Sequence, residues 1–226
     1  FDVVLILSGD QLYQMDLRDF INKHVESAAE ISIATLPVNE HDATGFGIMK
    51  MNSEGFIKNF VEKPRKEQLP DWVSPVDDKQ KAIGNMFMAS MGIYVFNRET
   101  LIRLFDKYPT HTDFGKEIIP TAINDGVSVK GYPYTGYWTD IGTIRSYFDA
   151  NLDLADLVPQ FNLFDNNNLI YTRARMLPPS KFSKDTMVKG SVISEGCIIS
   201  AREIERCVIG NRARIGGGTI MKNCVY

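Results

Sequence analysis

Apolar residues over the first 158 positions fall into short runs and alternating stretches, in an order that predicts a mixed α/β domain. Val3–Leu7 is a continuous apolar run, which is typical of a strand buried on both faces. A helix is predicted after a cap at Asp16 and a second strand over Ile31–Val38, so that these elements form a βαβ unit. Gly47–Met51 and Phe56–Val61 predict an antiparallel hairpin added to the same sheet. We therefore expect a mixed, mostly parallel sheet.

The strand over Val3–Leu7 needs neighbours on both sides if both of its faces are buried. We expect parallel neighbours, some of them supplied by residues upstream of Phe1. The sequence is accordingly interpreted as cut at both ends, with the catalytic-type domain ending near residue 158.

The pattern changes after this domain. Residues 159–183 contain Pro159, Pro178 and Pro179 and are interpreted as a linker. In residues 184–226, aliphatic positions recur every six residues, with one step a residue short: Val192, Ile198, Ile204, Ile209, Ile215 and Met221. This recurrence predicts a parallel β-helix of hexapeptide repeats, with one buried side chain on each face of a coil. Alternating strands in a sandwich are the other interpretation.

Composition and charge narrow the class of protein. The chain has 44% hydrophobic residues, 23% charged residues and a formal net charge of -3. Its lysines and arginines are scattered among carboxylates, so they form no basic stripe that would bind a nucleic-acid backbone. It also lacks an apolar run of the length that spans a membrane. We expect neither nucleic acid nor membrane as a partner, and a cytoplasmic location, or a plastid one in a plant or alga. Cys197, Cys207 and Cys224 lack zinc spacing and are interpreted as reduced core cysteines.

Two aspartates are candidates for holding a divalent cation. Asp10 follows the first strand, at the sheet edge where open α/β sheets bind ligands, and Asp140 lies in a segment rich in aromatic residues and glycine. Carboxylates of this kind bind Mg²⁺ together with substrate phosphates. The alternative for each is a structural role at the start of the following helix.

Glu62 and Lys63 form a second candidate pair, directly before Pro64 at the end of the predicted hairpin. A glutamate accepts hydrogen bonds from sugar hydroxyl groups, and a neighbouring lysine pairs with a phosphate. A solvated ion pair is the alternative. Ser90 has no GxSxG context and the histidines form no triad, so hydrolase chemistry has no support.

Six segments together resemble the glucose-1-phosphate adenylyltransferase family, also called the ADP-glucose pyrophosphorylases. The segments are LILSGDQLYQMDL, TGFGIMKMNSEGFIKNFVEKP, ASMGIYVFN, DFGKEIIP, GYWTDIGTIRSYFDANLDL and YTRARMLPPSK. The first ones are shared with other sugar nucleotidyltransferases. DFGKEIIP, the DIGT segment and PPSK point to the ADP-glucose branch more specifically.

The resemblance implies a Rossmann-like nucleotidyltransferase domain joined to a left-handed parallel β-helix, assembled as a homo- or hetero-tetramer. The implied reaction converts ATP and glucose 1-phosphate to ADP-glucose and pyrophosphate, in glycogen or starch synthesis. Carried over by motif, Asp10 and Asp140 hold Mg²⁺, and Lys63 is catalytic with them. Glu62 and Lys63 bind glucose 1-phosphate, and the sugar pocket is lined by Gly47, Ser90 and Trp138.

Three further expectations follow from the resemblance. The family's glycine-rich GGxGxRL loop does not occur in these 226 residues, so we expect this chain alone to be inactive. Arg173, Arg175 and Lys181 in the linker are a hypothetical site for an anionic effector, with a solvated basic linker as the alternative. The competing functions are synthesis of another nucleotide sugar and a regulatory subunit without activity.

Overall fold

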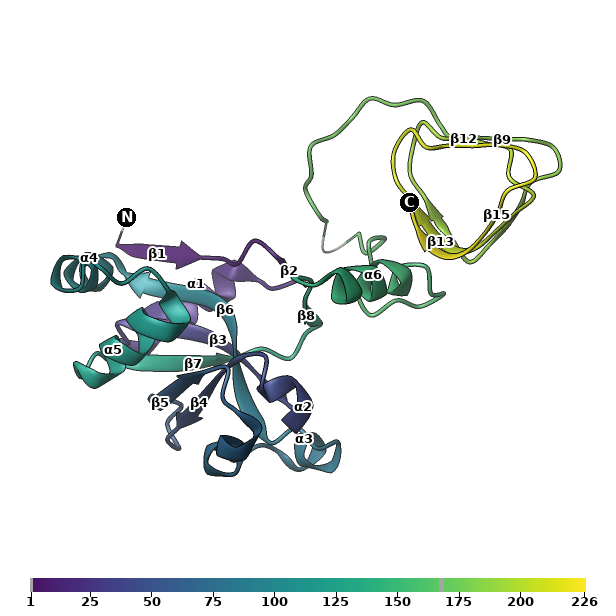
Figure 1. Cartoon of the computed structure of the whole chain (residues 1–226). Helices are drawn as coiled ribbons and strands as arrows, with labels where there is room; N and C mark the ends of the chain where they lie inside the picture. The colour runs from purple at the N-terminus through teal and green to yellow at the C-terminus, as the bar shows by residue number, and fades with distance from the viewer. Residues whose placement is uncertain (1, 167–168) are drawn as a thin grey trace. The chain divides into compact units, whose positions relative to one another are not determined.

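The computed structural model describes residues 2–166 and 169–226, which divide into two compact units (Figure 1). The first unit comprises the residues up to Gly9 together with Met15–Thr135. The second comprises Asp10–Gln14 together with Gly136–Tyr226. Among the helices of the described residues, none combines the length and apolarity that crossing a bilayer requires.

The first unit contains a six-stranded sheet in the order β5-β4-β6-β3-β7, with β1 paired to β6. Its strands are β1 (Val3–Ile6), β3 (Ile31–Val38), β4 (Gly47–Met51), β5 (Ile57–Glu62), β6 (Phe87–Asn97) and β7 (Val129–Pro133). Its helices and helical turns are α1 (Leu17–Ser27), α2 (Glu40–Ala43), η1 (Lys66–Trp72), α3 (Asp78–Ala82), α4 (Arg98–Lys107), η2 (Phe114–Ile118) and α5 (Ile119–Asn124).

Strand directions confirm the mixed α/β class and correct the expected neighbours of the first strand. Strands β1, β3 and β4 are each antiparallel to β6, and β7 is parallel to β3, so four strands run in one direction. The parallel neighbour expected for Val3–Leu7 is not found among the described residues, because the long strand β6 lies between β1 and β3. The predicted burial on both faces is also not found in the described structure, since all four residues of β1 are only partly buried and Leu7 is 44% exposed. An apolar run therefore fixes neither the burial of a strand nor the strand that pairs with it.

The two faces of this sheet carry separate cores. Successive side chains of a strand point to opposite faces. Met88 belongs to the cluster that also contains Phe96 and the helical residues Leu104 and Ile119, whereas its neighbour Ala89 belongs to the other cluster. This alternation is why β6 is buried along nearly its whole length.

Local sequence signals explain where the helices begin. The Asp16 carboxylate accepts hydrogen bonds from the backbone N–H groups of Arg18 and Asp19, at 2.9 and 3.1 Å, which confirms the predicted cap of α1. Asp113 caps the π-helical turn η2 by accepting from Lys116 N at 2.8 Å.

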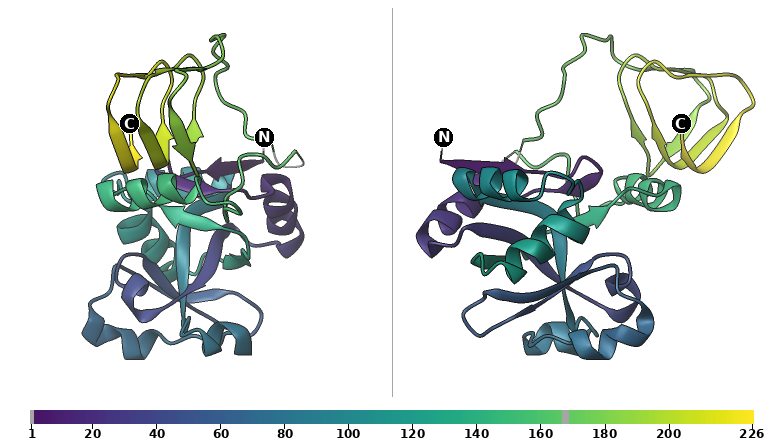
Figure 2. Two further views of the ribbon diagram at one scale, coloured as in Figure 1. Left: turned by 90° about the vertical axis from the view of Figure 1, so that its right-hand side faces the viewer. Right: turned by 60° about the vertical axis from the view of Figure 1, so that its left-hand side comes forward.

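The second unit begins with the antiparallel pair β2 (Gln11–Tyr13) and β8 (Trp138–Asp140), followed by α6 (Ile144–Asp153). Short parallel strands then form the coils of a β-helix, which has a triangular cross-section in Figure 1 and is seen from the side in the left view of Figure 2. The strands are β9 (Lys181–Phe182), β10 (Met187–Lys189), β11 (Val192–Ile193), β12 (Ile198–Ile199), β13 (Glu203–Ile209), β14 (Arg214–Ile215) and β15 (Ile220–Val225). Strand β9 lies within the segment predicted as a linker, of which residues 167–168 are outside the described part.

The β-helix interior confirms most of the predicted repeat but shifts its beginning by one residue. Ile204, Ile209 and Ile215 are buried as predicted, and Met221 packs partly buried against them. Ile198 is instead 45% exposed, while Ile199 is fully buried. The interior ladder pairs Ile193 with Ile209 and Ile199 with Ile215, because the chain turns a corner after five residues rather than six between positions 199 and 204.

The cysteines of the β-helix are free thiols. Cys197 and Cys207 are buried and Cys224 is partly buried beside Cys207 in the adjacent coil, so they serve as small core residues, as predicted.

Candidate functional site

In the first unit, three of the predicted sugar-binding positions meet at the ends of β4 and β5. Gly47 lies opposite Glu62 in the antiparallel pair. On the other side of β4, Ile48 lies opposite Ala89, and continuing that register by one pair brings Ser90 beside Gly47. The sheet therefore brings together residues that are far apart in the sequence.

Two glycines leave room for the Glu62 carboxylate. A Cβ atom added to Gly47 would overlap the Phe60 ring and lie 2.8 Å from Glu62 Oε2, and one added to Gly115 would lie 2.7 Å from the same oxygen. Both distances to Glu62 are too short for real contacts, so a side chain at Gly115 would displace the carboxylate and one at Gly47 would displace both the carboxylate and the Phe60 ring. The glycines thus give Glu62 its place at the site.

The surroundings of Glu62 favour its neutral form more than water does. Burial raises the pKa of its carboxyl group, the neighbouring Lys63 opposes this, and the Asp113 carboxylate adds to the rise. Within the described residues Glu62 forms no ion pair of 4.0 Å or less, so the solvated-pair alternative is not what the structure contains. A carboxylate in these surroundings is suited to accept hydrogen bonds from neutral hydroxyl groups.

Lys63 has a strained backbone. Its φ of 47° lies in the left-handed region, which costs a residue with a side chain roughly 1 kcal/mol or more. The conformation is held by a hydrogen bond from Lys63 N to Phe46 O at 3.0 Å, and the following Pro64 is buried. Strain of this kind gathers at ligand sites, where the surrounding structure imposes it.

Three residues that sequence reasoning did not assign complete this cluster. The Tyr94 phenol is buried, which raises its pKa to about 12; a hydrogen bond with Ser90 opposes the rise, and the Glu62 and Asp113 carboxylates add to it. Gly115 lies in the turn η2 and Asp113 caps it, and the π-helical form of this turn is common at functional sites. Both residues belong to the DFGKEIIP segment that carries part of the family resemblance, but no pattern in the sequence indicated that this segment lies next to Glu62.

In the second unit, Asp10 and Asp140 lie close together. Strand pairing sets Gln11 opposite Asp140, and Ile141 N donates to Asp10 O at 3.0 Å. A Cβ atom added to Gly142 would lie 3.0 Å from Asp140 Oδ1 and 3.1 Å from Asp10 Oδ2. Two carboxylate oxygens, one from Asp140 and one from Asp10, therefore border the space that the missing side chain of Gly142 leaves open.

Neither aspartate is the capping residue of the helix that follows it. The cap of α6 is Thr143, which accepts from Ser146 N at 3.0 Å, and the cap of α1 is Asp16. The Asp140 carboxylate instead accepts from Gly142 N at 2.7 Å. Two carboxylates next to an open space fit a magnesium ion, which takes one or two protein carboxylates and keeps several waters. Within the described residues no group of three or more metal-ligating side chains occurs.

The remaining predicted residues lie in the second unit without joining this pair. Trp138 stands opposite Tyr13 across the two-stranded sheet and donates from Nε1 to Gln11 Oε1 at 3.1 Å. Arg173 and Arg175 are exposed in the segment before β9, and Lys181 is exposed in β9 itself.

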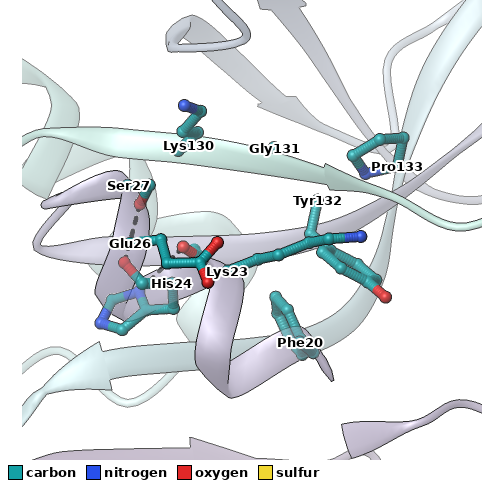
Figure 3. Close-up of a pocket in the computed structure, with 10 residues that line it drawn as sticks. Phe20, Lys23, His24, Glu26, Ser27, Lys130, Gly131, Tyr132 and Pro133 are labelled. Atoms are coloured by element: carbon teal, nitrogen blue, oxygen red, sulfur yellow. Dashed lines mark hydrogen bonds between the residues drawn. The ribbon is translucent and has the colours of Figure 1, made fainter. Parts of the chain in front are cut away.

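A separate cavity of about 280 Å³ lies in the first unit between α1 and β7 (Figure 3). Phe20, Lys23, His24 and Tyr132 are among its lining residues, and none of the predicted site residues is. His24 is 1% exposed there, with Nδ1 2.8 Å from Ser32 Oγ and Nε2 3.0 Å from Asn97 Oδ1. These bonds tie α1 to β3 and β6, which gives the histidine a structural role.

Known protein families match most of the chain. Residues 1–156 match the family model described as Nucleotidyl transferase, and residues 175–226 match the one described as GLGC left-handed parallel beta-helix domain. The chain therefore belongs to the nucleotidyltransferase family, and its β-helix is of the left-handed class.

Similarity to a curated protein is more specific. The chain is 43% identical over 225 residues to the protein named glucose-1-phosphate adenylyltransferase small subunit, chloroplastic/amyloplastic, from Triticum aestivum. The match covers 97% of this chain and 47% of that protein, so the chain spans about half the length of its curated relative. This confirms the resemblance that the sequence motifs indicated.

Proposed function

We propose that this chain belongs to an enzyme that forms ADP-glucose and pyrophosphate from ATP and glucose 1-phosphate, in starch or glycogen synthesis. The observation on which this proposal rests is the Glu62–Lys63 pair. The Glu62 carboxylate occupies space left by two glycines, and Lys63 next to it has a strained backbone. This arrangement suits a ligand with both hydroxyl and phosphate groups. The name of the Triticum aestivum relative supports the same substrates.

In this reaction a phosphate oxygen of glucose 1-phosphate bonds to the α-phosphorus of ATP, and the bond from that phosphorus to the pyrophosphate oxygen breaks. The attacking group is already an anion, so no strong general base is needed. Glu62 accepts hydrogen bonds from the sugar, and Gly47 and Ser90 line the sugar pocket. Lys63 binds the sugar phosphate and reduces the repulsion between the two anionic substrates.

Asp10 and Asp140 are the residues that would hold Mg²⁺, which supplies further neutralisation of phosphate charge when bound. Their fit rests on the open space at Gly142 between the two carboxylates. We also propose a tetrameric assembly, as the family resemblance implies, and an effector site at Arg173, Arg175 and Lys181. The relative's name places that protein in plastids, and the same location is proposed for this one.

Substitution of Lys63 tests the proposal. In the full-length protein, Lys63→Ala should raise the KM for glucose 1-phosphate by roughly 10- to 100-fold, because a charge-assisted contact to the phosphate is lost. The KM for ATP should change little. Lys58→Ala is the matched control, since Lys58 is an exposed lysine on the same strand, β5.

Nucleotide choice separates the competing functions. In the full-length protein, pyrophosphate release should be fastest with ATP when ATP, UTP, GTP and dTTP are compared with glucose 1-phosphate as acceptor. A preference for another nucleotide would replace ADP-glucose with that nucleotide sugar. No release with any of them would support the regulatory subunit instead.

A further inference from the structure

Glu117, in the turn η2, holds the backbone just before this turn. Its Oε2 atom accepts hydrogen bonds from Thr112 N at 2.8 Å and from Asp113 N at 3.0 Å. Both N–H groups precede a helical turn, where no carbonyl group of the turn is placed to accept them. The two bonds lower the pKa of the Glu117 carboxyl group, so the side chain is an anion at neutral pH and both bonds are charge-assisted.

The arrangement is reciprocal, because Asp113 caps the same turn. Asp113 Oδ1 accepts from Lys116 N at 2.8 Å, and Glu117 N donates to Asp113 O at 3.1 Å. In an ordinary capping box, the side chain that reaches back lies three residues after the cap. Here it lies one residue later, in a turn of π-helical form. Asp113 is therefore held at its N–H group, at its carbonyl oxygen and at its carboxylate.

These bonds place Asp113 close to Glu62. A Cβ atom added to Gly115 would lie 2.7 Å from Glu62 Oε2 and 3.6 Å from Asp113 Oδ1, so the two carboxylates border the same space. The Asp113 charge adds to the rise in the pKa of Glu62 that burial causes. Because two negative charges at this range repel each other, Asp113 needs a restraint to stay there. The hydrogen bonds to Glu117 supply part of that restraint.

Packing holds the residue that follows Asp113 in a different way. The centroid of the Phe114 ring lies 5.7 Å from that of Tyr94 and 5.8 Å from that of Phe96, and both of these rings are in the core of the first unit. Loss of the Glu117 hydrogen bonds should therefore release the residues before the turn without removing the turn from the core. A variant that lacks these bonds is expected to fold.

We propose that Glu117 is a positioning residue for the sugar site: through the backbone of Thr112 and Asp113, it holds the Asp113 carboxylate beside Glu62. Glu117 contacts the protein backbone and not the ligand. A sugar that binds at Glu62 then meets two carboxylates in fixed places, which reduces the entropy lost in ordering them on binding. This inference rests on the function proposed above, in which Glu62 accepts hydrogen bonds from the sugar.

Steady-state kinetics of the full-length protein tests the proposal. Glu117→Ala removes both hydrogen bonds and should raise the KM for glucose 1-phosphate roughly tenfold, with kcat and the KM for ATP nearly unchanged. Glu117→Gln keeps an acceptor oxygen at the same reach, so its KM for glucose 1-phosphate should stay within about twofold of the wild-type value. Glu99→Ala is the matched control, since Glu99 is an exposed glutamate in the first turn of α4.

A double-mutant cycle separates positioning from a purely structural role. In an Asp113→Ala background, Glu117→Ala should have little further effect on the KM for glucose 1-phosphate, because the carboxylate through which Glu117 acts is absent. A glutamate that only stabilised the turn would raise this KM by the same factor in both backgrounds.

The pH profile gives a second readout. Of the charged groups around Glu62, Lys63 and Lys116 lower the pKa of its carboxyl group and Asp113 raises it. Release of Asp113 in Glu117→Ala removes its part of the rise, so Glu62 stays ionised to lower pH. The acidic limb of kcat/KM for glucose 1-phosphate should therefore move to lower pH in Glu117→Ala and keep its position in Glu99→Ala.

The proposal is overturned if Glu117→Ala leaves the KM for glucose 1-phosphate unchanged, or if its effect is equally large in the Asp113→Ala background. Should Glu117→Ala fail to fold, Glu117→Asp replaces it in the same comparisons; its side chain is one methylene shorter, and a rise in KM of about threefold or more is expected. Lys63→Ala distinguishes this failure from failure of the proposed function, because an unchanged KM in Lys63→Ala would contradict the function itself.

Discussion

Single residues have unusual backbone conformation or burial at several places in this protein. Lys63, with φ of 47°, lies at the proposed sugar-phosphate position. Its backbone conformation costs free energy that a glycine would not. A left-handed backbone does not by itself mark a ligand site, since Arg206 has φ of 49° and its guanidinium group pairs with Asp156 at 3.6 Å.

His24 makes the stability of the first unit depend on pH. Burial lowers the pKa of its imidazole below the ordinary value of 6.5, and the hydrogen bond with Asn97 only partly opposes this. The unfolded chain therefore binds a proton more readily than the folded one, so stability is complete above pH 6.5 and falls as the pH drops below it. Urea unfolding at pH 7.5 and 5.5 should show a loss of up to roughly 1.4 kcal/mol per pH unit from this group.

His24→Gln should remove that part of the pH dependence, because glutamine keeps hydrogen-bonding capacity without titrating. His41→Gln is the control, since the His41 side chain is 96% exposed. Equal pH dependence in the wild type and in His24→Gln would show that the histidine does not contribute.

At the scale of elements, the β-helix shows how a one-residue shift changes which side chains are buried. Ile198 and Ile199 are neighbours in β12, yet only Ile199 enters the interior ladder with Ile215. Within a strand, alternate residues face opposite sides, so the position of the corner decides which of the two is buried.

Truncation of these two isoleucines should have very different effects on stability. Ile199→Ala leaves a cavity and should lower the free energy of unfolding of the second unit by about 2–5 kcal/mol. Ile198→Ala should cost less than about 1 kcal/mol, because its side chain is already partly in water. In a Trp72→Phe background, fluorescence of Trp138 reports urea unfolding of this unit. A larger loss of unfolding free energy for Ile198→Ala than for Ile199→Ala would mean that Ile198 is the interior residue, as the six-residue repeat in the sequence predicted.

At the scale of the whole molecule, contacts between distant parts of the chain produce both proposed sites. Asp10 follows the first strand, but strand β2 pairs with β8 and carries it into the second unit beside Asp140. In the first unit, Gly47, Glu62 and Gly115 come from β4, β5 and η2. Neither cluster exists before the tertiary structure forms.

The aspartate pair predicts a shared dependence on magnesium. In the full-length protein, Asp10→Asn and Asp140→Asn should each raise the Mg²⁺ concentration for half-maximal activity by roughly 10- to 100-fold. The double variant should be little worse than either single one, because both residues act on one ion. Asp16→Asn keeps the cap of α1 and should leave the Mg²⁺ dependence unchanged. Additive effects of the two substitutions would argue against a shared ion.

Local patterns predicted much of this structure because their causes are local. Asp16 and Asp113 cap helical turns through their own neighbouring N–H groups, and the hairpin of β4 and β5 forms between adjacent segments. Asn97 shows where a local signal is not enough. It immediately precedes α4, as a capping residue does, but its side chain bonds His24 instead of the helix, because a buried imidazole far away in the sequence takes that hydrogen bond.

The sequence by itself determined the mixed α/β class, the start of α1, the core cysteines and the coil of short parallel strands. These follow from side-chain periodicity and capping chemistry, which act over a few residues. Only the tertiary structure decided that β6 separates β1 from β3, that Ile199 and not Ile198 is interior, and that Gly115 and Asp113 stand next to Glu62. Those outcomes depend on which distant segments pair, because the free energy of packing is shared between residues that no local pattern connects.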